Sequence, residues 1–154
     1  NFPSDTYQMS RLTNYCGQWI RHCGWYPDIK LRLVNKHLGH WGGQNPHDKF
    51  VCKDENVTTA RLKGDLLHYS YYHIEEHYQQ ADRFASIAAK ALSEKGKQSS
   101  IPYALIKTGF KFFRNYILKA GFLDGRNGYT ICKIGAIETW WKYTRLIQLN
   151  KNIQ

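Results

Sequence analysis

Residues 74–96 read IEEHYQQADRFASIAAKALSEKG, and this stretch divides the chain into a strand-rich part and a helical part. Its apolar side chains recur at intervals of three and four residues, which is typical of an amphipathic helix. Glu75 and Glu76 lie in the first turn, where carboxylates interact favourably with the helix dipole, and Gly96 suits a helix C-terminus. We therefore expect one long amphipathic helix over residues 73–96, with an apolar face formed by Ile74, Tyr78, Ala81, Phe84, Ala85, Ala88, Ala91 and Leu92.

Short strand patterns precede this helix, over residues 1–72. Residues 29–34 alternate apolar and polar side chains (IKLRLV), which is typical of a half-buried strand. Residues 39–46 contain the breakers Gly42-Gly43 and Asn45-Pro46, so we expect a loop there. The other expected strands cover residues 7–15, 19–21, 47–52, 60–63 and 66–71.

Two further helices are expected after residue 96. Pro102 can begin a helix that runs to about Ala120, and residues 121–128 hold three glycines and are expected to form a turn. The last helix is expected over residues 129–149. Strands followed by three helices fit a small α+β domain, or the second half of a larger α/β domain with a helical appendage.

The chain carries a net charge of +10 over 154 residues, concentrated near its C-terminus. Residues 1–100 hold 13 Lys and Arg against 10 Asp and Glu, whereas residues 101–154 hold 9 against 2. Such a basic segment indicates an anionic partner, either nucleic acid or a phospholipid surface. No run of about 18 apolar residues predicts a membrane span, and no signal peptide is evident. The four cysteines form no C-x-x-C pair, so we expect reduced, mostly buried thiols.

The helix expected over residues 102–120 combines basic and aromatic side chains. Lys107, Lys111 and Arg114 form a ragged basic stripe beside several Ile and Phe side chains, which is typical of a helix lying among lipid headgroups. Trp140 and Trp141 in the next helix belong to a residue type enriched at membrane interfaces. A helical hairpin with solvated lysines is the alternative. Nucleic-acid binding could use the same charge, but no helix-turn-helix, RNP-type or zinc-finger pattern accompanies it.

Candidate chemical groups lie in the strand-rich part, where no nucleotide-binding loop, nucleophile elbow or zinc-protease motif occurs. Asp48, beside His47, can act as a general base in a semi-enclosed site, or can cap a turn next to Pro46. His68 can ligate a metal, or can be an interior histidine on a strand.

Aromatic side chains in the same part offer a second kind of chemistry. Trp25, Tyr26 and Trp41 can stack on the C–H faces of sugar rings, or can belong to the core. Trp41 stands beside two glycines in the expected loop, so we expect it least in a core.

Five motifs together resemble the C-terminal half of bacterial family 2 glycosyltransferases, in particular those that resemble lipopolysaccharide-core β-glucosyltransferases. The similarity covers about residues 7–149. The motifs are RLTNYCGQWIRH (11–22), GWYPDIKLRL (24–33), WGG (41–43), NPHD (45–48) and LKGDLLHYSY (62–71).

This resemblance implies the C-terminal part of a nucleotide-diphospho-sugar transferase fold, with short mixed strands followed by three helices. The implied reaction is an inverting transfer of a hexose from a nucleotide sugar, such as a UDP-hexose, to a hydroxyl of lipopolysaccharide or another cell-surface glycan. Residues 1–72 would supply the acceptor side, and residues 101–154 a basic aromatic hairpin facing the membrane. The implied location is the cytoplasmic face of the inner membrane, with no nucleic-acid partner.

The resemblance also implies roles for individual residues. The family has His followed by Glu or Asp at the position of His47-Asp48, which makes Asp48 the expected general base. His68 would face a metal-bound diphosphate, with magnesium or manganese present in the complete enzyme. Acceptor contacts are expected from Trp25, Tyr26, Arg32 and Trp41. The nucleotide-binding half is missing and residue 1 is Asn, so we expect a fragment that is inactive alone.

Overall fold

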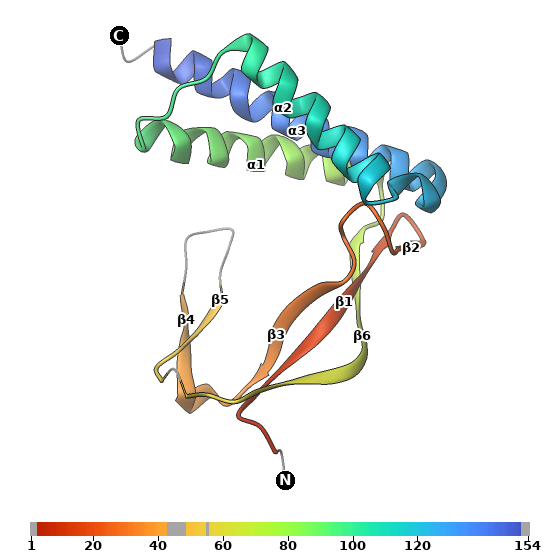
Figure 1. The fold of residues 1–154 in the computed structure, drawn as a ribbon, viewed down its shortest axis with the longest axis vertical. Helices are drawn as coiled ribbons and strands as arrows, with labels where there is room; N and C mark the ends of the chain where they lie inside the picture. Colours follow the sequence, from red (N-terminus) through yellow and green to blue (C-terminus); the bar gives the residue numbers. More distant parts are fainter. Residues whose placement is uncertain (1–2, 43–48, 55, 152–154) are drawn as a thin grey trace. The chain divides into compact units, whose positions relative to one another are not determined.

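The computed structural model describes residues 3–42, 49–54 and 56–151. The chain is mixed α+β, with small sheets followed by three α-helices (Figure 1). It packs as two compact units. The sheet unit comprises residues 1–12 and 26–68, and the helical unit comprises residues 13–25 and 69–154. Residues 13–25 therefore belong to the same compact unit as the helices.

The first sheet is built around β1, and its strands are β1 (Thr6–Tyr15), β2 (Gln18–Ile20), β3 (Asp28–Val34) and β6 (Thr59–Tyr71). Strand β1 pairs with the other three strands, antiparallel to β2 and β3. In the sheet unit, Arg11 lies opposite Asp28 and Met9 lies opposite Lys30. Side chains of every second residue share a face of a sheet, so Arg11, Asp28 and Lys30 lie on the same face.

Two expectations for the strands were wrong. Residues 39–42, expected in a loop, form β4 (Gly39–Gly42), which pairs with β5 (Lys49–Cys52) after the short 3-10 helix Lys36–Leu38. Glycine permits this pairing because a Cβ at Gly39 would lie 2.3 Å from the backbone oxygen of Val51. The two strands expected at residues 60–63 and 66–71 are one strand, because Gly64 continues the chain at a φ of +92°.

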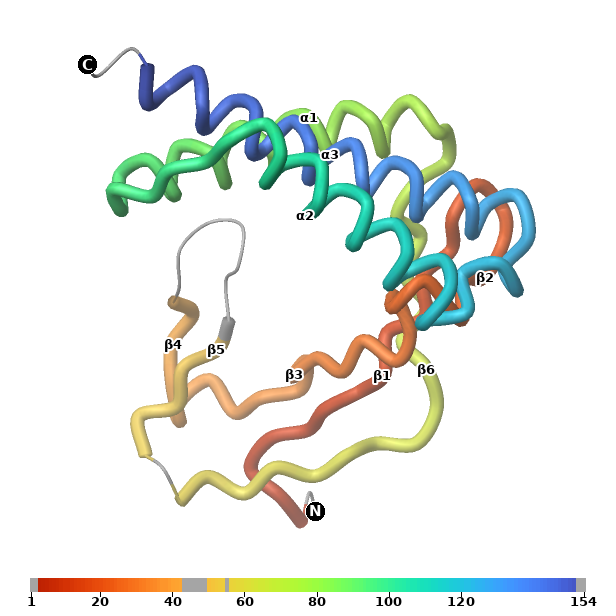
Figure 2. Tube along the Cα trace, turned by 45° about the horizontal axis from the view of Figure 1, so that its top comes forward, coloured from red at the N-terminus to blue at the C-terminus, as the bar shows by residue number. Residues whose placement is uncertain are grey.

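The helical unit contains α1 (Ile74–Glu94), α2 (Ile101–Phe113) and α3 (Gly125–Lys151). Helix α3 packs against both α1 and α2, and Figure 2 shows it alongside them. The expected amphipathic pattern of α1 is confirmed in outline, but the centre of its buried stripe is the row His77, Ala81, Ala85 and Ala89. Small alanine side chains let α3 approach α1 closely.

The connection from α2 to α3 differs from the expected continuous helix and turn. Residues Arg114–Leu118 form a π-helix (η2), and Gly121–Asp124 form a 3-10 helix (η3). Helix α3 begins at Gly125, four residues earlier than expected. A Cβ at Gly128 would lie 2.0 Å from the oxygen of Gly121, so glycine is needed where the first turn of α3 crosses η3.

The core of the helical unit lies where the β1–β2 hairpin meets α3. Tyr15, Ile20, Cys23, Ile131 and Cys132 form this buried cluster. All four cysteines are free thiols, of which Cys23 and Cys132 are buried. Within the described ranges, no helix combines the length and the apolar character that crossing a bilayer requires.

Candidate functional site

The expected catalytic pair, His47 and Asp48, lies outside the described residues, so its geometry stays a prediction. The hairpin formed by β4 and β5 carries Trp41, which is 57% exposed and packs edge-on against Phe50 with ring centroids 5.9 Å apart. The expectation that Trp41 lies outside a core is confirmed. An exposed indole ring is available for stacking on a ligand.

A cluster of charged side chains lies on one face of the sheet unit. Arg11 forms an ion pair with Asp28 at 2.5 Å, and Lys30 lies 3.1 Å from the same carboxylate. Burial lowers the pKa of His68 and the positive charges of Arg11 and Arg32 lower it further, while the carboxylate of Asp28 opposes the shift. The positive charges of Arg11 and Arg32 disfavour a metal cation at His68, although Asp28 offsets part of that charge.

The residues expected to bind an acceptor do not all lie in one unit. Tyr26 belongs to the sheet unit and donates its hydroxyl to Asp65 at 3.0 Å. Trp25 belongs to the helical unit, where its ring packs edge-on against Tyr15 at 5.8 Å and against His77 at 5.6 Å. Trp25 therefore supports the core of the helical unit, as in the alternative interpretation of its sequence.

His77 is a buried polar residue that the sequence analysis did not select. Its Nδ1 lies 3.1 Å from the hydroxyl of Tyr15, and its ring stacks on Tyr71 with centroids 4.7 Å apart. Burial lowers the pKa of His77 to about 4. The sequence could have predicted that His77 is buried, because it lies four residues before Ala81, in the row of small residues that α1 buries.

We expect the stability of the helical unit to fall as the pH drops from 6.5 to 4. The unfolded chain takes up a proton at His77 near pH 6.5, whereas the folded chain does so only near pH 4. The free energy of unfolding should therefore be unaffected above pH 6.5 and lose about 3 kcal/mol across this window. Urea unfolding at a series of pH values measures this loss. In the variant His77→Gln the loss should be smaller by that amount, and identical pH profiles for the two proteins would contradict the assignment.

The exposed side of α2 and η2 is mainly apolar. Ile106 is 68% exposed, Phe110 is 55% exposed and Leu118 is 63% exposed. We call this surface the α2 face, and it comprises Leu105, Ile106, Phe110, Phe113, Ile117 and Leu118. Residues 101–123 contain four basic residues and no acidic residue. The exposed cations Lys107 and Arg114 border the face.

Three of the residues expected on a membrane-facing surface do not belong to the α2 face. Lys111 is half-buried and packs against Gly135 of α3, and burial lowers the pKa of its ammonium group. Trp140 and Trp141 are also partly buried, and the Arg145 guanidinium lies 5.7 Å from the ring of Trp141. Lys107 and Arg114 are the two expected residues that reach solvent beside the apolar side chains.

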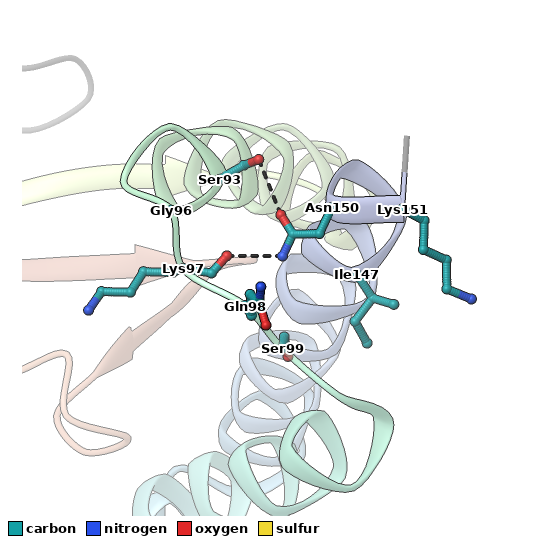
Figure 3. A pocket seen from close by; sticks show the side chains of 8 residues that line it. All are labelled: Ser93, Gly96, Lys97, Gln98, Ser99, Ile147, Asn150 and Lys151. Atoms are coloured by element: carbon teal, nitrogen blue, oxygen red, sulfur yellow. Dashed lines mark hydrogen bonds between the residues drawn. The ribbon is translucent and has the colours of Figure 1, made fainter. Parts of the chain in front are cut away.

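The far end of the helical unit holds a surface hollow of about 360 Å³ (Figure 3). Asn150 of α3 fixes the chain beside it by accepting from Ser93 Oγ at 3.4 Å and donating to the backbone oxygen of Lys97 at 3.0 Å. Figure 3 shows the side chains of Lys97 and Lys151 extending outward. These contacts explain the structure of the α1–α2 connection and suggest no chemistry.

The chain matches no protein-family model, and no solved structure matches it. Its class is therefore defined by its own fold, a mixed α+β chain with a sheet unit and a three-helix unit.

Proposed function

We propose that this chain docks on an anionic phospholipid surface through the α2 face. The observation that carries this proposal is the combination of six exposed apolar side chains with bordering cations and no acidic residue between positions 101 and 123. Apolar side chains of such a face enter the boundary between headgroups and acyl chains, while the cations remain among the headgroups. The location that follows is peripheral, on a membrane surface such as the cytoplasmic face of the bacterial inner membrane.

The lipid charge should decide the strength of docking. Each Lys or Arg near an anionic bilayer contributes about 1 kcal/mol, and this contribution vanishes on a neutral bilayer. Lys107, Arg114 and Lys119 are exposed, so binding to neutral vesicles should be about 100-fold weaker.

Co-sedimentation with vesicles tests this proposal. The 154-residue chain should sediment with vesicles rich in phosphatidylglycerol, less with pure phosphatidylcholine, and less again at high salt, because salt screens the attraction. Equal binding to both lipids, or none to either, would refute charge-assisted docking. Retention on DNA without vesicle binding would instead favour a nucleic-acid partner.

A second candidate function is the one that the sequence resemblance implies. We propose that the chain is the acceptor-side and membrane-facing part of a nucleotide-diphospho-sugar transferase, which moves a hexose from a nucleotide sugar to a hydroxyl of a glycan or glycolipid. The positive charge of Arg11 and Arg32 around His68 supports this proposal, because diphosphates and many surface glycans are anionic. A non-catalytic membrane- or glycan-binding module is the alternative.

The described residues alone do not provide a binding site for the magnesium or manganese ion that the resemblance implies. No group of three metal-ligating side chains comes together among them, and the positive charges of Arg11 and Arg32 lower the pKa of His68. We therefore assign the described residues no step that requires a metal.

The expected base, Asp48, gives a direct test of glycosyl transfer. In the complete enzyme, Asp48→Asn should lower kcat by about 100-fold, because the acceptor hydroxyl loses the group that takes its proton. Nucleotide-sugar binding should stay nearly unchanged. Asp54→Asn is the matched control, because Asp54 is exposed nearby in the sequence. A kcat close to that of the unmodified enzyme would show that Asp48 is not the base. Sugar transfer by the 154-residue chain alone would contradict the expectation that this chain is inactive by itself.

A further inference from the structure

A partly enclosed cavity of about 170 Å³ lies inside the helical unit, between α1, η2 and α3. Its volume equals that of about six water molecules in the liquid, which is comparable with the volume of one monosaccharide. Five of its lining residues bear on what it can bind: Trp25, Gln80, Lys111, Asn115 and Glu138. None of the six residues of the α2 face lines this cavity.

Asn115 is the least satisfied polar residue of this cavity. Its side chain is 7% exposed, and its Oδ1 has no hydrogen-bond partner among the described residues. Buried amide oxygens are nearly always paired with protein, water or a ligand. Asn115 also lies in the π-helix η2, and π-helical turns occur frequently at functional sites. Asn115 Oδ1 is therefore free to accept a hydrogen bond from a molecule in the cavity, either water or a ligand.

Lys111 and Glu138 provide opposite charges from facing helices. No ion pair of 4 Å or less joins either of them to another described residue. Burial lowers the pKa of Lys111 and raises the pKa of Glu138, and the attraction between the two charges offsets part of each shift. The positive charge of Lys142 also lowers the pKa of Glu138. Half-buried charges that do not touch require other polar partners, and the cavity is where such partners can lie.

The polar and charged side chains that line the cavity determine what kind of ligand it can bind. Glu138 disfavours an anion and Lys111 disfavours a cation, whereas neutral hydroxyl groups can accept from the ammonium and donate to the carboxylate. Asn115 Oδ1 can accept from a further hydroxyl. Gln80 Oε1 already accepts from Tyr71, which leaves its amide N–H groups as donors. Trp25 also lines the cavity, and the C–H groups of a sugar ring can pack against the part of the indole that reaches it.

We propose that this cavity binds one neutral monosaccharide ring, held by Lys111, Asn115 and Glu138 and packed against Trp25. The proposal depends on neither the docking of the α2 face nor glycosyl transfer by the complete enzyme. Its failure would leave both of those proposals standing.

The test is a titration of the 154-residue chain with D-glucose and D-galactose, followed by the ¹H–¹⁵N signals of the Trp25 indole and the Asn115 amide. We expect saturable shifts of these signals for at least one sugar. Asn115→Leu keeps a similar volume and should weaken binding about tenfold, as expected for the loss of one well-placed hydrogen bond. Glu138→Gln provides a second variant if Asn115→Leu does not fold.

Thr108→Val is the matched control, because Thr108 Oγ1 is also buried without a partner but does not line the cavity. This variant should bind sugar as the unmodified chain does. Unsaturable shifts spread over the surface, or equal affinities of the unmodified chain and Asn115→Leu, would overturn the proposal. Saturable shifts of the same signals by glycine or inorganic phosphate but not by sugars would also overturn it, in favour of a zwitterionic or anionic ligand.

Discussion

The double variant Ile106→Asp, Phe110→Asp is expected to bind anionic vesicles about 1000-fold more weakly than the unmodified chain. Both side chains are more than half exposed on the α2 face, so the substitutions remove apolar area from the surface that would enter the bilayer. They also add two negative charges beside anionic lipids, each opposing binding by about 1 kcal/mol. The fold should be unaffected, because neither side chain contributes to the buried core. Vesicle co-sedimentation and circular dichroism measure the two effects.

The matched control is Leu67→Asp, which replaces an exposed apolar residue of β6 in the sheet unit. This variant gains one negative charge, which should weaken vesicle binding about tenfold at most. If the double variant of the α2 face binds as well as the control, the α2 face is not the docking surface. Trp141→Ala gives a further comparison, because partly buried Trp141 was expected to face the membrane. A greater loss with this variant would shift the docking surface to α3.

The helices could be predicted from sequence because their evidence is local. The spacing of apolar residues after Ile74 and the position of Pro102 determine where α1 and α2 begin, within one residue. The β4 strand could not be predicted, because glycines at residues 39 and 42 normally mark a loop. Its stability depends on Val51 and Phe50 of the partner strand, which permit nothing larger than Gly39. That contact depends on the pairing of β4 with β5, which the sequence around Gly39 does not reveal.

The cavity lined by Lys111, Asn115 and Glu138 could not be predicted from local sequence either. A regular helix would continue one basic stripe through Lys107, Lys111 and Arg114, but Lys111 lies against α3 and Arg114 begins a π-helix. The wider π-helical turn changes the direction of the side chains that follow, so Asn115 is buried in a segment expected to face a membrane surface. Glu138 lies 27 residues after Lys111, and no local pattern connects them. The only sequence evidence that could have singled out Glu138 is that it is one of just two acidic residues in residues 101–154.

Asp124→Ala is expected to lower the free energy of unfolding by about 3 to 5 kcal/mol, the largest loss of stability that we expect from a single substitution in this chain. Asp124 is 5% exposed and accepts hydrogen bonds from the backbone N–H groups of Arg21 and His22, at 3.3 and 2.8 Å. Its Oδ1 also lies 2.9 Å from Nδ1 of His22. Alanine would leave these partly buried donors without their buried acceptor, and the residues after β2 would lose their hydrogen bonds to the segment where η3 meets α3.

Urea unfolding followed by circular dichroism measures the loss, with Asp82→Ala as the matched control. Asp82 forms an ion pair with the side chain of Arg145, but the side chain of Asp82 is 54% exposed. Asp82→Ala should therefore lower the free energy of unfolding by less than about 1 kcal/mol. Asp124→Asn separates charge from hydrogen bonding, because its amide oxygen can still accept from one backbone N–H group. A loss for Asp124→Ala no greater than that for Asp82→Ala would show that water or a rearranged backbone replaces these bonds. The connection would then not depend on Asp124, and Gly128, where an added Cβ would lie 2.0 Å from the oxygen of Gly121, would be its main determinant.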